Sequence, residues 1–211
     1  MTDTDRIALD LETIPLVDEP DFADPSHWTV FAAALGYSDG EATEVDVLFR
    51  ESHTLTAEAA LINDAIDWIA ERAGSNRVIL TYNGESYDIP VLQHRAERID
   101  DVEPEVNVSE RLGLLLDTSQ HVDLIEDMRE LEGDWVSLDD ALDSHDITAD
   151  TPTWMGEPVT GSDMPSMGLE LLTDRDNTEL REAVRRYASS DVKPLFELHK
   201  ELRGAADVGR H

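Results

Sequence analysis

The sequence contains no cysteine, which excludes a disulfide scaffold, a thiolate zinc site and a cysteine nucleophile. It also lacks an apolar run of roughly 18 residues, the length of a membrane span, and its opening residues have no signal-peptide pattern. We therefore expect a cytoplasmic protein that makes no membrane contact. Hydrophobic residues make up 40% of the chain, enough for a buried core, and the length predicts a single domain over residues 1–211.

Positive charge is scarce as well. The chain has 16 lysines and arginines against 48 acidic residues, a formal net charge of −32, and its only lysines are Lys193 and Lys200. The acidic residues are spread along the chain, which is typical of adaptation to molar salt, where a Debye length of roughly 3 Å screens their repulsion. We expect a halophilic source; the alternative is an ordinary acidic protein with a basic partner.

This charge does not exclude nucleic acid as a ligand. Phosphate binding normally draws on lysine, arginine and the release of counterions. In molar salt the gain from counterion release largely vanishes, so such a protein would bind through stacking, hydrogen bonds and metal bridges. Net charge therefore leaves the class of ligand open.

The pattern of apolar residues predicts strands first and helices later. Alternation predicts a strand over residues 6–13, and two apolar runs around an Asp-Gly turn predict a hairpin from 28–37 and 43–51. A helix over 56–73 is expected, with Thr56 as its N-cap and Gly74 as its stop. The further predicted elements are a strand at 77–84, a helix at 88–99, short helices around a strand at 121–124, a helix opened by Ser137, an irregular segment at 148–167, and helices at 168–173 and 177–203. Together they indicate an α/β fold with a central mixed five-stranded sheet, three antiparallel strands and then parallel ones, flanked by helices.

Three acidic sites stand out, with four carboxylates between them. Asp10 and Glu12 are two residues apart on the first strand, so their carboxylates share a face. Asp88 begins a helix after a buried strand, and Tyr187 and Asp191 are four apart on a late helix. The four carboxylates could converge on two divalent cations, because Mg²⁺ and Mn²⁺ prefer oxygen ligands and paired ions suit phosphoryl displacement. Taken singly, a chance acidic pair, a helix N-cap and a surface pair explain the same residues, so the ordered set carries the hypothesis.

Three segments in order carry a resemblance: "LDLETIP" at 9–15, "YNGESYDIPVL" at 82–92 and "YASSD" at 187–191. With them the sequence resembles the DEDD 3′–5′ exonucleases of the ribonuclease H-like superfamily, in the tyrosine-containing (DEDDy) class. Within that class it is similar to the proofreading domains of family B DNA polymerases and their stand-alone relatives. The resemblance implies a ribonuclease H-like fold and, with the acidic composition, a halophilic archaeon as the source.

The resemblance also implies a site. It assigns four carboxylates to two Mg²⁺ or Mn²⁺ ions: Asp10, Glu12, Asp88 and Asp191. Tyr187 would orient the attacking water, Asn83 would contact the substrate, and Thr13 and the backbone of Leu11 would lie near the terminal nucleotide. The implied reaction is hydrolysis of single-stranded nucleic acid from its 3′ end to nucleoside 5′-monophosphates, with DNA favoured over RNA. No polymerase or separate nucleic-acid-binding domain accompanies the motifs, so we expect a replication or repair protein as partner.

Two other functions remain open at this point. The protein could be a catalytically silent ribonuclease H-like module that binds nucleic acid or a replication or repair partner. It could also be an acidic cation-binding or partner-binding protein without nuclease activity, which would explain the charge but not the order of the motifs.

Several further residues allow two interpretations each. Arg95 could contact phosphate or lie on a solvated helix face. The arginines at 181, 185 and 186 could steer a strand or neutralise neighbouring acids. Trp154 and Met155 could stack on a base or anchor a loop. We expect a structural role for His121, and core positions for Trp28 and Trp68.

Overall fold

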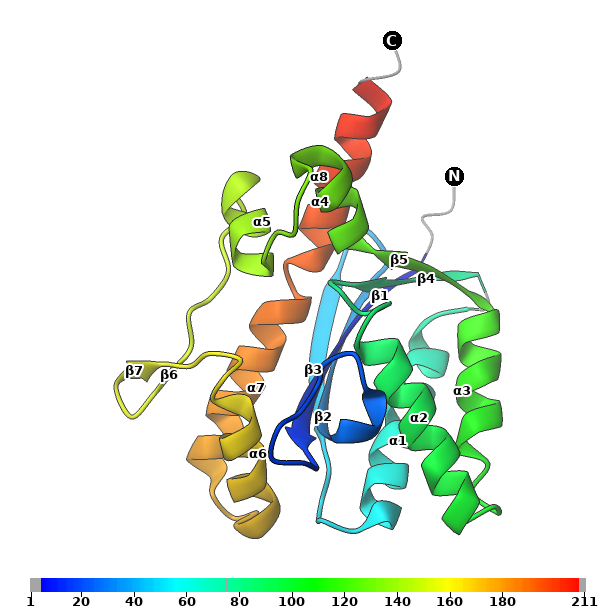
Figure 1. Ribbon diagram of the computed structural model, residues 1–211. Helices are drawn as coiled ribbons and strands as arrows, with labels where there is room; N and C mark the ends of the chain where they lie inside the picture. Colours follow the sequence, from blue (N-terminus) through cyan, green and yellow to red (C-terminus); the bar gives the residue numbers. More distant parts are fainter. Residues whose placement is uncertain (1–4, 75, 209–211) are drawn as a thin grey trace.

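The computed structural model describes residues 5–74 and 76–208, and its centre is one five-stranded sheet (Figure 1). The strand order is β3-β2-β1-β4-β5. Strands β1 (Arg6–Pro15), β2 (Trp28–Ser38) and β3 (Thr43–Phe49) are antiparallel, whereas β4 (Arg77–Thr81) and β5 (Ser119–Asp123) continue the sheet in parallel with β1. The predicted mixed sheet is therefore confirmed.

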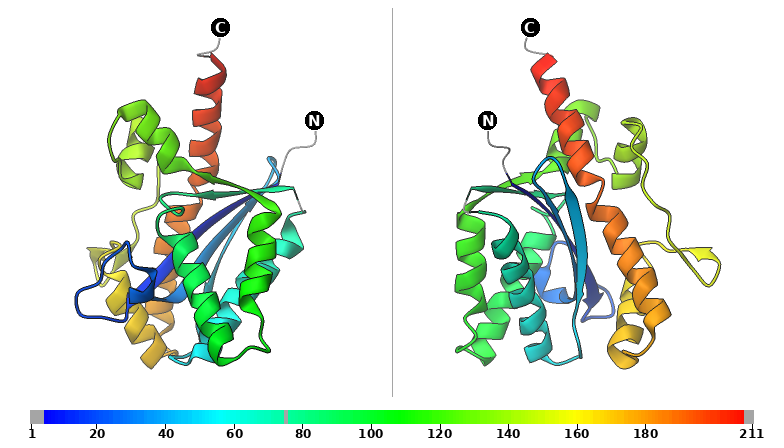
Figure 2. Two further views of the ribbon diagram at one scale, coloured as in Figure 1. Left: turned by 45° about the vertical axis from the view of Figure 1, so that its right-hand side comes forward. Right: turned by 180° about the vertical axis from the view of Figure 1, so that it is seen from behind.

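Helices cover both faces of the sheet (Figures 1 and 2). One face carries α1 (Leu55–Arg72), α2 (Asp88–Val102) and α3 (Val108–Asp117). The opposite side of the molecule is built by α4 (Leu124–Glu132), α5 (Leu138–Ser144), α6 (Met164–Thr173), α7 (Thr178–Val192) and α8 (Leu195–Val208). A short 3-10 helix, η1 (Pro25–His27), precedes β2, and a small hairpin joins β6 (Thr153–Trp154) to β7 (Glu157–Pro158).

The alternation of β1 divides its side chains between two hydrophobic cores. Ile7, Leu9 and Leu11 belong to the core under α1, α2 and α3. Ala8 belongs to the other core, with residues of α6, α7 and α8. Because successive side chains of a strand point to opposite faces, Asp10 and Glu12 continue the face of Ala8. The two carboxylates therefore lie on the side of the sheet that α7 covers.

A β-bulge interrupts the alternation of side chains along β2. The pairing of β1 with β2 shifts between Glu12 and Thr13, so that Glu12 pairs with Ala32 and Thr13 with Val30. The extra residue, Phe31, joins the same core as Ala32. Helix α6 approaches Phe31 closely at Gly168, where a Cβ atom would lie 2.6 Å from the ring.

Two predicted helix limits are wrong. The N-cap of α1 is Thr54, which has an extended backbone and whose side-chain hydroxyl accepts a hydrogen bond from the N–H of Ala57. Thr56 lies inside the helix. The single helix predicted over 177–203 is two helices, α7 and α8. Pro194 separates them, because proline has no N–H to continue the helical ladder.

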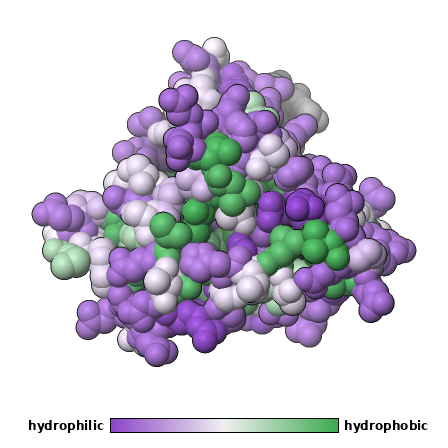
Figure 3. Space-filling view, turned by 60° about the horizontal axis from the view of Figure 1, so that its bottom comes forward, coloured by the Kyte–Doolittle hydropathy of each residue, from purple (hydrophilic) through white to green (hydrophobic). Residues whose placement is uncertain are grey.

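The segment predicted to be irregular is partly ordered. Residues 148–167 contain the β6–β7 hairpin, and α6 already begins at Met164, with proline in its first turn. Trp28 and Trp68 are buried, as expected. The face seen in Figure 3 is mostly hydrophilic, with hydrophobic residues gathered towards its middle. Among the helices of the described residues, none is both long and apolar enough to cross a membrane.

Candidate active site

The site begins where β1 extends beyond its neighbour β4. Parallel pairing with β4 covers only Arg6 to Ala8 of β1, opposite Val78 to Leu80. Beyond that point Asp88, the first residue of α2, accepts a hydrogen bond from the backbone N–H of Leu11 at 3.1 Å. A buried N–H must be satisfied, so the Asp88 carboxylate takes the place of a strand partner and is held against β1.

A tight loop connects β4 to α2 and carries Asn83. Asp123, at the end of β5, accepts hydrogen bonds from the backbone N–H of Asn83 at 2.6 Å and of Glu85 at 2.8 Å. Asn83 has a φ of 66°, in the left-handed region that asparagine tolerates. A Cβ atom at Gly84 would lie 2.4 Å from the side chain of Thr81, so only glycine fits there without a shift.

Three carboxylates from two elements meet beside this loop. Oxygens of Asp10 and Glu12, on β1, and of Asp191, on α7, all lie within 4.8 Å of one another. Asp88 is outside this group of three but lines the same cleft. The structure brings together in that cleft all eight residues that the resemblance assigned to the site: Asp10, Leu11, Glu12, Thr13, Asn83, Asp88, Tyr187 and Asp191.

Burial raises the pKa of every one of these carboxyl groups, and repulsion from other carboxylates adds to the shift at Glu12, Asp88 and Asp191. Burial raises the pKa of Asp10 to about 6 and that of Asp191 to about 8, and the charge of Asp10 adds to the shift at Asp191. Burial, followed by repulsion from other carboxylates of the cleft, raises the pKa of Glu12 and Asp88 well above the ordinary values. In the described part of the chain, no lysine or arginine lines the cleft to offset these charges.

The donor set fits a divalent metal ion. Glu12 is 5% exposed, and its Oε1 atom is buried without a hydrogen-bond partner among the described residues. A buried carboxylate oxygen without a partner is costly unless a cation or a donor reaches it. Clustered carboxylate oxygens are the ligands that Mg²⁺ and Mn²⁺ prefer.

A family model of the ribonuclease H superfamily matches residues 7–203. The chain belongs to this superfamily. No protein matches in a comparison with curated sequences.

Solved structures of Exonuclease I are similar to this ribonuclease H superfamily chain in fold. The Escherichia coli enzyme in complex with a 5cy-dT13 oligonucleotide has a TM-score of 0.51 and 16% identity, with 96% of this chain and 40% of that chain covered. Exonuclease I in complex with the inhibitor BCBP gives a TM-score of 0.51 and 15% identity, with coverages of 94% and 41%. This chain thus spans about two fifths of the length of the proteins it matches.

Tyr187 lies one helical turn before Asp191 and lines the same cleft. Burial and the charges of Asp191 and Glu12 raise the pKa of its hydroxyl far above the ordinary value. With its pKa raised, the hydroxyl is protonated at neutral pH and is available as a hydrogen-bond donor and acceptor.

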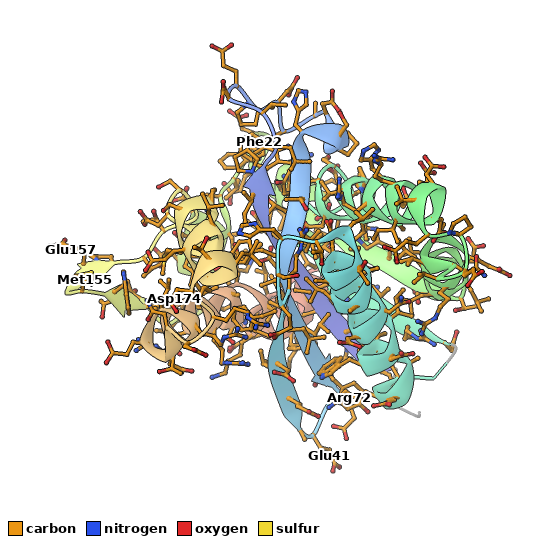
Figure 4. All side chains as sticks on the ribbon, turned by 90° about the horizontal axis from the view of Figure 1, so that it is seen from below. Phe22, Glu41, Arg72, Met155, Glu157 and Asp174 are labelled. Atoms are coloured by element: carbon orange, nitrogen blue, oxygen red, sulfur yellow. The ribbon has the colours of Figure 1, made fainter. Side chains whose placement is uncertain are left out.

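An aromatic wall, formed by Phe22, Trp28 and Tyr87, lines the same cleft of this superfamily member. Phe22, labelled in Figure 4, belongs to the loop after β1. Its ring stacks on Trp28 with a centroid distance of 4.8 Å, and Tyr87 meets Trp28 edge-on at 5.6 Å. The hydroxyl of Tyr87 also hydrogen-bonds that of Thr13 at 2.6 Å. Sequence reasoning placed Trp28 only in the core and missed Phe22, which no local pattern marks. Tyr87 was visible as the aromatic residue of the second motif.

Asp123 was also missed, although the sequence places it at the end of a predicted strand. Its neighbour on β5, His121, hydrogen-bonds Thr81 at 2.9 Å, which fits the structural role expected for this histidine. Trp154 packs against the core on the α7 side, and Met155 is 87% exposed at the turn of the β6–β7 hairpin, so neither lines the cleft (Figure 4).

The arginines singled out by the sequence lie elsewhere. Arg95 is neither solvated nor in the cleft: it is buried and donates to Glu58 at 2.7 and 2.8 Å. Arg185 pairs with Asp46 at 3.1 Å and Arg181 lies 3.8 Å from Glu51, which favours neutralisation of neighbouring acids. Arg186 donates to a backbone carbonyl, that of residue 153.

Proposed function

We propose that this protein is a metal-dependent 3′–5′ exonuclease of the DEDDy type that hydrolyses single-stranded nucleic acid to nucleoside 5′-monophosphates. The observation that carries the proposal is the cluster of Asp10, Glu12 and Asp191 oxygens within 4.8 Å, with one oxygen of Glu12 buried and lacking a hydrogen-bond partner in the described structure. Membership of the ribonuclease H superfamily and the similarity in fold to Exonuclease I support a nuclease.

The carboxylates of the cluster, together with Asp88, would hold two Mg²⁺ or Mn²⁺ ions. Such ions, when bound, offset the charge of the carboxylates and of a phosphate, and lower the pKa of water. The ions would also relieve the repulsion that raises the carboxyl pKa values of the cleft. Asp88 enters this set already oriented by the backbone of Leu11.

The remaining residues would bind and orient the substrate. The protonated hydroxyl of Tyr187 would orient the attacking water, and Asn83 and Thr13 would contact the terminal nucleotide. The exposed ring of Phe22, stacked on Trp28, offers a surface for a base. Stacking contributes roughly 1–3 kcal/mol per base and does not depend on phosphate charge, so it suits an acidic protein.

We further propose DNA as the preferred substrate. Support comes from the second motif, "YNGESYDIPVL", which resembles that of the polymerase proofreading domains. The Escherichia coli Exonuclease I structure of similar fold contains a 5cy-dT13 oligonucleotide. A single domain over residues 1–211 and a replication or repair partner also stay proposals.

Degradation of 5′-labelled single-stranded DNA and RNA in molar KCl, with Mn²⁺ or Mg²⁺, tests the function. The expected result is a ladder that shortens from the 3′ end, faster with DNA. The ladder should be absent with EDTA and in the Asp10→Asn variant. It should persist in Asp64→Asn, which changes an exposed carboxylate of α1 outside the cleft. If folded protein shortens neither oligomer at any salt or metal concentration, the protein is a silent binding module instead.

A further inference from the structure

A second cluster of polar side chains lies at the opposite end of the sheet from the carboxylates. It forms a pocket, here called the cationic pocket, lined by Arg6, Asn76, Arg77, Val78, Gln120, His199, Lys200 and Arg203. The residues come from the amino ends of β1, β4 and β5 and from α8. Figure 1 shows the start of β1 and helix α8 on the same side of the molecule, away from α6. Within residues 5–74 and 76–204, no carboxylate lines this pocket.

The register of the sheet builds the floor of the pocket. Arg6 of β1 pairs with Val78 of β4, and Val78 pairs with Gln120 of β5, so the three residues lie side by side across the sheet. Residues abreast on neighbouring strands share a face, and two strand spacings separate Arg6 from Gln120 by roughly 10 Å. On α8, His199 and Arg203 are one helical turn apart and share a side of the helix.

Most of the described arginines are paired with carboxylates, unlike three of the cations in this pocket. Eight arginines pair with carboxylates: Arg50, Arg72, Arg95, Arg111, Arg129, Arg175, Arg181 and Arg185. Within the described residues, Arg77, Lys200 and Arg203 make no such ion pair. Arg77 is 7% exposed and donates Nε to the carbonyl of Gly74 at 2.6 Å, and Arg203 donates Nε to His199 at 3.2 Å.

Two acids lie near the pocket without lining it. Asp5 lies close enough to influence Arg77, and Asp127 feels the charge of Arg203, but neither lines the pocket. In a chain of net charge −32, a pocket whose described lining holds Arg77, Lys200 and Arg203 but no carboxylate is an unusual local field. Guanidinium groups bind tetrahedral oxyanions in a forked geometry that matches phosphate.

We propose that the cationic pocket binds a small phosphate-type oxyanion, either inorganic phosphate or the phosphate of a nucleoside monophosphate. A nucleic acid strand is the weaker candidate, because the groove that shares Arg203 with this pocket is strongly acidic. That groove is lined by five carboxylates: Glu85, Asp123, Glu126, Asp127 and Glu130. A long polyanion would meet these charges, whereas a small anion contacts the pocket alone. The proposal does not rest on the nuclease proposal.

His199 provides a spectroscopic probe of occupancy. It is 6% exposed, and burial, Arg203 and Arg6 lower its pKa to about 4. A bound oxyanion would oppose the effect of the two cations. The imidazole signals of His199 should therefore shift, and its pKa should rise, when phosphate is added.

The test is titration of the full chain with inorganic phosphate or a nucleoside 5′-monophosphate, in KCl with EDTA, followed by NMR of His199 and by calorimetry. Saturable binding is expected, and Lys200→Ala and Arg203→Ala should each weaken it by about tenfold or more. Lys193→Ala, which removes a cation outside the pocket, should bind as the parent does, and so should the nuclease variant Asp10→Asn. Tighter binding of the monophosphate than of phosphate would identify a nucleotide as ligand.

Three results would overturn the proposal. The first is the absence of a saturable response to both probes in protein whose circular dichroism is native. The second is an equal loss of anion affinity in Lys193→Ala and Lys200→Ala, which would mean that binding depends only on the net charge of the protein. The third is tighter binding of a single-stranded oligonucleotide than of the monophosphate, with the oligonucleotide binding lost in Lys200→Ala.

Discussion

Glu12 and Asp191 illustrate how the site stores unfavourable electrostatic energy at the level of single residues. Their pKa values are raised in the folded protein, by burial first and by neighbouring carboxylates second. A group whose pKa is higher in the folded state binds protons more tightly there than in the unfolded chain. Its contribution to stability is then present at low pH and is lost as the pH rises through the folded-state pKa.

The metal-free protein should therefore lose stability as the pH rises from about 4 to about 8, the range between the ordinary aspartate pKa and the pKa values of about 6 and 8 at Asp10 and Asp191. Urea unfolding at a series of pH values, in EDTA and constant KCl, measures this change in the free energy of unfolding. Asp191→Asn removes one such group, so its loss of stability over this range should be smaller than that of the parent. Mn²⁺ should restore stability most at the alkaline end. An identical pH profile for parent and variant would contradict the assignment.

Phe22 is the residue whose removal should separate substrate binding from folding. Its side chain is 68% exposed and stacks on Trp28 at the edge of the cleft. In Phe22→Ala we expect kcat/KM on single-stranded DNA to fall roughly 5- to 100-fold, mainly through KM, with unchanged stability. Met155→Ala, which truncates an exposed apolar residue outside the cleft, is the matched control. Equal kinetics of Phe22→Ala and parent would exclude a stacking role.

At the scale of elements, Glu58 joins α1 to its neighbours. It is fully buried, accepts the N–H of Val30 in β2 at 2.9 Å, and pairs with Arg95 of α2 at 2.7 Å and Arg50 at 3.5 Å. Removing one partner of such a buried network leaves the other charges uncompensated. Buried ion pairs broken in this way cost about 3–5 kcal/mol.

Glu58→Gln should accordingly lower the free energy of unfolding by about 3–5 kcal/mol in urea denaturation. The control is Asp67→Asn, which breaks the surface pair of Asp67 with Arg111 and should cost less than about 1 kcal/mol. A cost for Glu58→Gln that matches the control would mean that Arg50 and Arg95 find other partners or water.

The elements that sequence predicted well are those whose pattern is local. Alternation in residues 6–13 is enough to place Asp10 and Glu12 on one face, and Ser137 caps its helix as expected. What sequence could not show depends on distant partners. Arg95 is buried because Glu58, 37 residues away along the chain, lies opposite it.

The candidate site also combines residues that local sequence identifies with residues that only the fold brings in. The three motifs name its carboxylates, but Asp123 acts on the Asn83 loop only through the parallel pairing of β4 and β5. Phe22 reaches the cleft because its loop folds back on Trp28, which no local pattern predicts. The roles assigned to the eight cleft residues stay predictions until the variants are measured.

For the whole molecule, the dominant quantity is the net charge of −32. Added KCl shortens the Debye length from about 10 Å at 0.1 M to about 3 Å at 1 M, so repulsion between carboxylates declines most steeply below that concentration. We expect the melting temperature to rise strongly with KCl and to level off near molar salt. A melting temperature that is independent of KCl would contradict the prediction of a halophilic protein and favour an ordinary acidic one.

The bulge opposite Glu12 bears on which changes in chain length the protein can accept. Both the carboxylate cleft and the cationic pocket take residues from one face of β1, at Arg6 and at Asp10 and Glu12. A single inserted residue between Ala8 and Asp10 would turn the two carboxylates into the apolar layer beneath α1 and α2. Strand β2 already contains one surplus residue, Phe31, without loss of pairing on either side. Insertions and deletions should consequently be excluded from the first half of β1, even where substitutions are tolerated.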